Sequence, residues 1–237
     1  MGLPFRWRTS VQGLCVMPFL LSCSLLQEAT TFTLDTGWKD LAVDATGLPD
    51  FGGSATLPNV PCTKAQDTCA TGLSNAACTG GNWSCKTQCG ESASCALAAT
   101  VELGLPVDIS AQVKNQTSAN VISKATLNEF VYNTLENTLN VDTPELELYV
   151  GPSSATRVGD PGVVFFARMP RLPAGTKRNE ILKVDEAGKE ALASFVRNYT
   201  QPFKILAKGS SLFNGGQALP KGRLRMQLKA KFQVTPL

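Results

Sequence analysis

The stretch RLRMQLKAKFQV, residues 223–234, decides the fold class, because polar and apolar side chains alternate along it without a break. One face carries Leu224, Met226, Leu228, Ala230, Phe232 and Val234, and the other carries Arg223, Arg225, Gln227, Lys229, Lys231 and Gln233. Alternation places every second side chain on the same face of a strand. The segment is therefore predicted to be a long strand with one buried face.

Related patterns upstream predict further strands. We expect strands near 38–43, across 101–113, and within 126–135, 144–150, 163–169 and 203–208. In the second of these, Pro106 favours a sheet edge or a bulge, because proline cannot donate to a neighbouring strand. The segment TLNEFVYNTL, 126–135, also fits a helical stripe, and the strand interpretation is preferred. Asn214-Gly215-Gly216 predicts a turn before the final strand.

One helix is predicted in DEAGKEALASFVRNY, residues 185–199. Asp185 can cap its first turn, and Pro202 ends it. Leu192, Phe195, Val196 and Tyr199 form its apolar stripe. Residues 97–237 are therefore expected to form a mainly β domain, an antiparallel β-sandwich with one covering α-helix.

The N-terminal residues 1–22 have the layout of a signal peptide, with two arginines before a mostly apolar run that is too short to span a bilayer. The run ends in Leu20-Leu21-Ser22-Cys23, which resembles the lipobox of bacterial lipoprotein precursors. This resemblance implies cleavage before Cys23 and lipidation of that cysteine. Because Ser24 follows rather than Asp, it also implies the outer membrane. Ordinary secretion remains the alternative.

Residues 23–60 are expected to be a lipidated tether containing one short strand, followed by a disulfide-rich loop segment at 61–96. Of the eight cysteines, Cys15 and Cys23 lie near the N-terminus, and the remaining six are Cys62, Cys69, Cys78, Cys85, Cys89 and Cys95. Large apolar residues there are limited to Leu73 and Trp83, so cross-links must hold the segment. In an exported chain these cysteines predict three disulfides, and the sequence leaves their pairing open. Their spacing lacks paired C-x-x-C motifs, so no metal is predicted.

Charge is segregated along the chain although the formal net charge is only +3. Residues 23–164 hold 6 basic and 15 acidic side chains, and residues 165–237 hold 14 basic and 4 acidic ones. Arg223, Arg225, Lys229 and Lys231 form a cationic ladder that could bind anionic lipid, acidic polysaccharide or an acidic partner. The preferred interpretation is pairing within the chain, with Glu102, Asp108, Glu145 and Glu147 as the candidate partners.

Histidine is absent, which excludes Ser/His/Asp and Cys/His catalysis. Leu34-Asp35-Thr36-Gly37 resembles the catalytic turn of aspartic proteases, but the chain has one copy and that family needs two aspartates. A solvated turn is the better interpretation. No phosphate-binding glycine loop or EF-hand spacing occurs. We therefore predict neither a cofactor nor a catalytic site.

The sequence as a whole predicts an exported, outer-membrane lipoprotein whose β-sandwich binds or scaffolds without catalysis, facing the periplasm or the surface. Its layout resembles uncharacterised lipoproteins of Gram-negative bacteria such as myxobacteria. The expected partners are the membrane, through the lipid on Cys23, and an envelope protein or anionic lipid or polysaccharide, but not nucleic acid. A carrier of a lipid or other apolar ligand and a carboxylate-dependent envelope hydrolase are the alternatives.

Overall fold

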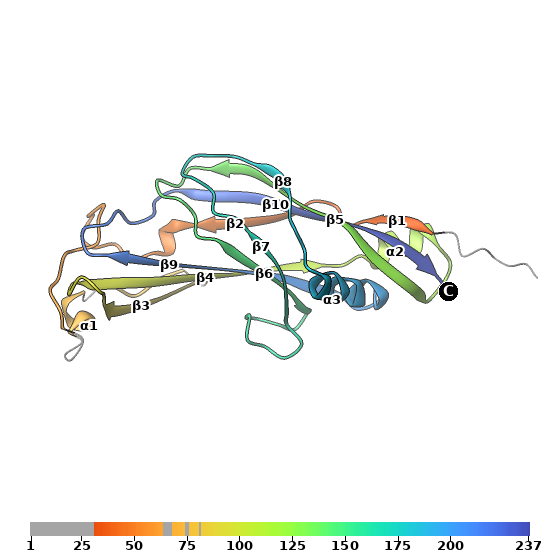
Figure 1. The fold of residues 1–237 in the computed structure, drawn as a ribbon, viewed down its shortest axis with the longest axis horizontal. Coiled ribbons are helices and arrows are strands. Elements are labelled where there is room, and N and C mark those ends of the chain that lie inside the picture. Colours follow the sequence, from red (N-terminus) through yellow and green to blue (C-terminus); the bar gives the residue numbers. More distant parts are fainter. Residues whose placement is uncertain (1–30, 64–67, 74–75, 81) are drawn as a thin grey trace, which may run out of the picture.

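The computed structural model describes residues 31–63, 68–73, 76–80 and 82–237, and these form two antiparallel sheets packed face to face (Figure 1). The mainly β sandwich expected from the sequence is confirmed. The segments expected as signal peptide and lipidation site, including Cys23, lie outside the described residues.

The first sheet is built around β10 (Arg223–Pro236). On one side β10 pairs with β5 (Ile122–Asn137), which carries β8 (Asn179–Ile181) at its outer edge. On its other side β10 pairs with β1 (Phe32–Asp35) and then with β2 (Lys39–Asp44). The apolar side chains from Leu224 to Val234 are all buried, as the alternation predicts. The segment around 126–135 is a strand, which excludes its helical interpretation.

The second sheet is built around the pair of β4 (Cys95–Val107) and β9 (Phe203–Asn214). β3 (Trp83–Cys89) pairs with β4. On the other side β9 pairs with β6 (Leu146–Pro152), which in turn pairs with β7 (Val164–Met169). The strands expected at 144–150, 163–169 and 203–208 are therefore confirmed, and β9 runs six residues further than expected, to Asn214.

The core lies between the two sheets, where both bury their apolar faces. Phe130 of β5 meets Phe166 of β7 edge to face, with ring centroids 5.0 Å apart. Tyr132 is also buried, and its hydroxyl donates to Glu180 at 3.0 Å. Such a core stabilises the sandwich by removing apolar surface from water, which is worth roughly 25 cal/mol per Å².

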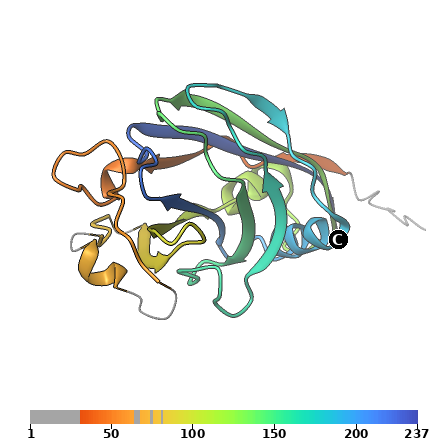
Figure 2. The same ribbon diagram turned by 60° about the vertical axis from the view of Figure 1, so that its left-hand side comes forward.

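The predicted helix is α3 (Glu186–Arg197), and it covers the core beside β5 and β7 (Figure 2). Asp185 caps it by accepting a hydrogen bond from the Gly188 amide at 2.6 Å. Leu192, Ala193 and Val196 are buried along one face. Both the cap and the apolar stripe agree with the sequence prediction.

The strand expected across 101–113 is too long and must be corrected. β4 ends at Val107, and α2 (Ser110–Gln116) follows. Asp108 starts this turn by accepting a hydrogen bond from the Ser110 amide at 2.9 Å. Ile109 and Val113 are four residues apart, a spacing that also places two side chains on one helix face, so alternation alone could not exclude a helix here.

Pro106 lies at a sheet edge, as expected. The pairing of β3 with β4 ends at Trp83 opposite Val101, and beyond it no described strand pairs with the outer edge of β4. Proline there leaves one fewer unpaired N–H group to attract another strand.

The segment at 61–96 is more ordered than the predicted cross-linked loop. It contains α1 (Cys69–Gly72) and β3, and β3 belongs to the second sheet. A second, smaller apolar cluster forms here, consisting of Leu57, Cys62, Cys69, Leu73, Cys95, Leu97 and Leu219. Because β1, β2 and β3 all precede residue 97, the sandwich starts well before the expected boundary, at Phe32.

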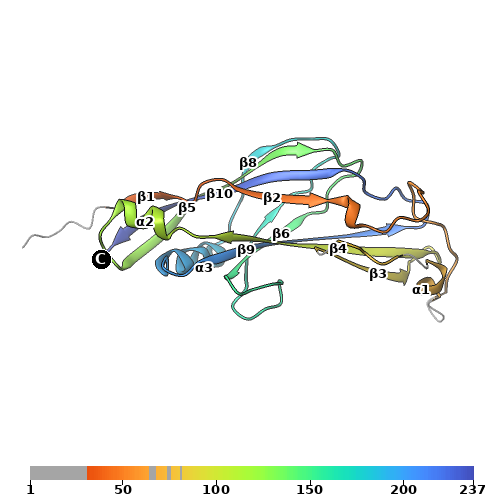
Figure 3. The ribbon, with the colours of Figure 1, turned by 180° about the vertical axis from the view of Figure 1, so that it is seen from behind.

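The sandwich is elongated, and its two ends differ (Figures 1 and 3). One end holds the start of β1, α2 and the end of β10; Thr31, the first described residue, lies here, and we call it the N-terminal end. The opposite end holds α1 and the turn between β3 and β4. With 14 residues, β10 alone spans about 46 Å of this length.

Candidate functional site

A groove opens between the end of β2 and the start of β3, and its volume is about 500 Å³. Pockets that bind small molecules measure roughly 300–1,000 Å³, so the groove is large enough to hold one. Its polar lining is Asp44, Thr46, Thr79, Asn82 and Arg223, and its apolar lining is Ala42, Val43, Trp83, Val101 and Leu103. We call it the Trp83 groove. It lies where β10 begins, at the other end of that strand from Pro236.

Two glycines allow the floor of the groove to form. A Cβ atom on Gly47 would lie 2.6 Å from Cδ1 of Trp83, and one on Gly80 would lie 3.1 Å from the Gly47 Cα. The Thr79 amide donates to the Gly47 carbonyl at 2.9 Å. These contacts hold the 3₁₀ turn η1 (Ala45–Gly47) against the chain that leads into β3.

Asp44 joins the two walls of the groove through its backbone and its side chain. Its carbonyl accepts a hydrogen bond from Trp83 Nε1 at 2.9 Å. Its carboxylate caps η1 by accepting from the Thr46 amide at 2.9 Å. That hydrogen bond lowers the pKa of Asp44 below its ordinary value, and the positive charge of Arg223 adds a smaller effect in the same direction. Asp44 is therefore a negatively charged capping residue at neutral pH.

A narrow apolar crevice lies beside the groove, between the two sheets. The two spaces share Val43, Trp83 and Val101 as lining residues. The crevice measures about 40 Å³, and Ala99, Ser211 and Phe213 contribute to its other walls. A cavity needs about 10–15 Å³ to hold one water molecule, so the crevice accommodates only a small group.

The sequence contains only weak signals for this groove. Trp83 stands out in the cysteine segment only as one of two large apolar residues. Gly47 and Gly80 lie more than thirty positions apart, and their contact exists only in the folded chain.

The structure favours pairing within the chain for three of the four residues of the cationic ladder. Arg223 lies 3.4 Å from Glu136, Lys229 lies 3.8 Å from Asp35, and Lys231 lies 3.1 Å from Glu129. Arg225 is exposed and makes no ion pair with the residues that the structure describes. Asp35, Glu129 and Glu136 were not among the expected partners.

Of the four expected acidic partners, Glu102 pairs with a cation of β9, since it lies 3.9 Å from Lys208. Glu145 and Glu147 instead pair with Arg168 of the neighbouring strand, both at 3.5 Å. Asp108 caps the turn before α2. Charges are thus paired across strands, and apart from Glu102 with Lys208 the paired residues differ from those that the sequence alone indicates.

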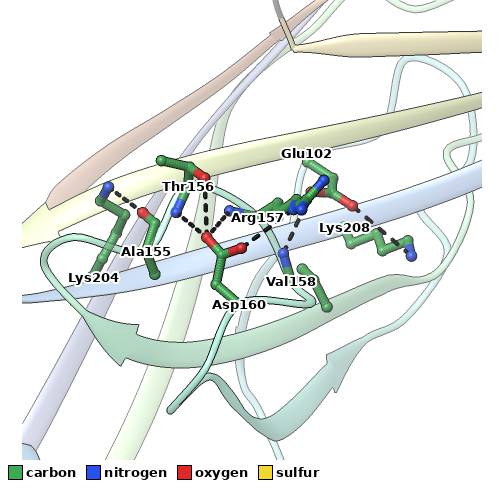
Figure 4. A network of polar contacts seen from close by, with 8 residues as sticks. All are labelled: Glu102, Ala155, Thr156, Arg157, Val158, Asp160, Lys204 and Lys208. Carbon is green, nitrogen blue, oxygen red and sulfur yellow. Dashed lines mark hydrogen bonds and ion pairs between the residues drawn. The ribbon is translucent and has the colours of Figure 1, made fainter.

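The loop between β6 and β7 folds over β4 and β9 through a polar network (Figure 4). Asp160 accepts hydrogen bonds from the amides of Thr156 and Arg157 at 2.7 and 3.1 Å and from the Thr156 hydroxyl. These bonds lower the pKa of Asp160 to about 2. Lys204 of β9 donates to the Ala155 carbonyl, which ties the loop to the sheet.

Several described carboxylates accept hydrogen bonds that hold the local fold. Carboxyl groups with a displaced pKa, namely Asp44, Asp108, Asp160 and Glu190, are all displaced downward by hydrogen bonds. A general acid needs a raised pKa. In the Trp83 groove, Asp44 is the one carboxylate among the described lining residues.

The aspartic protease resemblance at residues 34–37 corresponds to a structural turn. Asp35 accepts a hydrogen bond from the Gly37 amide at 2.8 Å. The Thr36 hydroxyl is buried and accepts from the Ala230 amide at 3.0 Å. This turn lets β1 and β2 lie one after the other along β10.

The six clustered cysteines form three disulfides, as predicted, and the structure assigns their pairing. The bonds join Cys62 to Cys89, Cys69 to Cys95, and Cys78 to Cys85. The sulfur atoms of Cys62, Cys69 and Cys95 lie within 4.8 Å of one another. All three are engaged in disulfides, so they offer no thiolate for a metal ion.

Within the described part of the chain, no helix is long and apolar enough to cross a membrane. No protein-family model and no curated protein matches the chain.

Proposed function

We propose that the protein is a lipid-anchored binding module of the bacterial cell envelope, exported to the outer membrane and without catalytic activity. The observation that carries this proposal is that the N-terminal end of the sandwich and the Trp83 groove lie at opposite ends of β10. The chain enters the sandwich at the N-terminal end, whereas the Trp83 groove lies at the far end of β10.

Chain length limits the distance between the anchor and the sandwich. Eight residues, 23–30, separate the predicted lipid from the first described residue, and they can span at most about 28 Å. An anchor on Cys23 therefore keeps the N-terminal end near the bilayer. The Trp83 groove lies at the other end of β10 from this anchored end, which leaves it within reach of a ligand or partner.

The disulfides support the expected compartment. Three bonds close loops within 62–95, next to a small apolar cluster that contains two of these cystines. Disulfides persist in oxidising compartments such as the periplasm and are rare in the cytosol. The cross-links thus favour an exported protein.

The geometry supports the two alternatives less well. A carrier needs an apolar cavity that encloses its ligand. Two apolar spaces between the described sheets measure about 40 and 10 Å³, and each is too small for an acyl chain. A hydrolase needs converging carboxylates, which the described residues of the groove do not provide.

Mass spectrometry of the protein purified from a Gram-negative membrane fraction tests the proposal. We expect removal of residues 1–22 and a diacylglycerol group on Cys23. The Cys23→Ala variant is the control, and it should stay unlipidated and leave the outer-membrane fraction. An unmodified mature chain that starts at another residue would contradict the proposed anchoring.

A further inference from the structure

The Trp83 groove has the chemical character of a site for a neutral, hydroxyl-rich ligand. Two threonines, an amide and the oppositely charged side chains of Asp44 and Arg223 provide donors and acceptors in several directions. The opposite charges of Asp44 and Arg223 leave the lining without net charge. Arg223 is also 3.4 Å from Glu136, which further weakens its attraction for an anion.

Apolar surface lies beside these polar groups. Trp83, Val43, Val101 and Leu103 line the groove together with Asn82 and Thr79. A pyranose ring combines apolar C–H faces with hydroxyl groups at its rim, so it can contact both kinds of lining at once. Small-molecule sites commonly combine an apolar wall with a few directional polar groups.

The apolar crevice beside the Trp83 groove indicates which substituent the ligand carries. It is apolar, measures about 40 Å³, and shares three lining residues with the groove, including Trp83. Its size suits a small substituent such as a methyl or acetyl group. A sugar that carries an acetamido group has such a substituent next to its ring hydroxyls.

We propose that the Trp83 groove binds a neutral glycan containing an N-acetylated amino sugar, with the ring in the groove and the acetamido methyl group in the crevice. The inference extends the proposed function, since it names the ligand class of the module. Recognition itself depends on the groove and not on the lipid anchor.

Two trisaccharides test this inference by calorimetric titration of the purified full-length mature protein. The probes are tri-N-acetylchitotriose and cellotriose, which share a β-1,4-linked pyranose backbone and differ in the acetamido group. We expect the acetylated probe to bind about tenfold more tightly or better. Equal affinities, or absence of binding by the acetylated probe at millimolar concentration, would overturn the proposal. Binding of an extended peptide instead would overturn it as well.

A pair of substitutions on β9 locates the acetamido group. Ser211 lies opposite Ala99 and lines the crevice, whereas Ser210 is exposed on the outer face and hydrogen-bonds with Thr100. Ser211→Val should reduce the affinity for the acetylated probe to that for cellotriose, because it fills the crevice. Ser210→Val is the matched control and should leave both affinities unchanged. An unchanged preference in Ser211→Val would place the acetyl group elsewhere and overturn this assignment.

The groove itself is tested with Asn82→Ala. The Asn82 side chain is exposed, and its backbone carbonyl accepts from the Glu102 amide at 2.9 Å, a contact that the substitution leaves in place. The variant should therefore fold normally and bind both sugars several-fold more weakly. Unchanged binding would contradict the proposed site. Failure of lipidation would refute the anchor while leaving these titrations unaffected, so the two proposals fail separately.

Discussion

Asp160 illustrates how single aspartates organise the turns of this protein. It accepts two backbone N–H groups from residues that precede it by three and four positions. Asp35, Asp44, Asp108 and Asp185 likewise accept backbone amides close to them in sequence. An aspartate at a turn satisfies N–H groups that no strand or helix pairs with. The sequence identified Asp185 as a cap, because a clear helical stripe follows it, and missed the others.

Replacing Asp160 should change how stability depends on pH. Its folded-state pKa is about 2, whereas an aspartate in an unfolded chain titrates near ~3.9. A lowered folded-state pKa adds stability above pH ~3.9 that is lost as the pH falls toward 2. We therefore expect Asp160→Asn to be less stable than the wild type at neutral pH, with a difference that shrinks between pH ~4 and ~2.

Thermal melts recorded by circular dichroism across this pH range test the prediction. Glu91→Gln is the matched control, because Glu91 is exposed and makes no hydrogen bond or ion pair with other described residues. A constant difference between wild type and Asp160→Asn at all pH values would show that the carboxylate is not responsible.

At the scale of the elements, α3 packs so closely on β7 that backbone meets backbone. A Cβ atom on Gly188 would lie 2.6 Å from both the Cα and the carbonyl oxygen of Phe166. Glycine in the first turns of a helix otherwise costs stability relative to alanine. At position 188 the close approach of α3 to the Phe166 backbone requires a glycine. Propensity and periodicity predict that this helix exists, but they do not show which residue touches the sheet.

Gly188→Ala should therefore destabilise the protein, opposite to the usual effect of this substitution in a helix. Overpacking of this kind costs roughly 1–3 kcal/mol. Gly159→Ala is the control, because no atom lies within 4 Å of its Cβ position, and a change within about 0.5 kcal/mol is expected there. Urea denaturation monitored by tryptophan fluorescence measures both. A more stable Gly188→Ala variant would show that the helix is not packed in this way.

At the scale of the whole molecule, the charge segregation along the sequence disappears on the outer face of the first sheet. β10 carries the cationic ladder, and its neighbours β1, β2 and β5 bring acids opposite it, including Asp35, Glu129 and Glu136. Each exposed pair contributes little stability, about 0–1 kcal/mol. Together they reduce the positive field that an anionic surface would encounter.

Vesicle binding should reflect this local neutrality. We expect Arg223→Ala/Arg225→Ala to change co-sedimentation of the Cys23→Ala protein with anionic vesicles by less than about twofold. The contrasting variant Glu129→Gln/Glu136→Gln unpairs two cations and should increase binding, most strongly at low salt. A large loss of binding in the arginine variant at low salt, with a difference from the parent protein that disappears at high salt, would instead support a polyanion site on the ladder.

The sequence by itself determined the fold class, most strands, α3 and the use of six cysteines as disulfides. These features depend on local patterns, namely alternation, capping and composition, which each segment carries without reference to the rest of the chain. Tertiary structure alone decided the disulfide pairing, the end of β4 at Val107, the acids that face the ladder and the Trp83 groove. Each of these depends on contacts between residues distant in sequence, such as Gly47 with Gly80, which form only when two sheets dock.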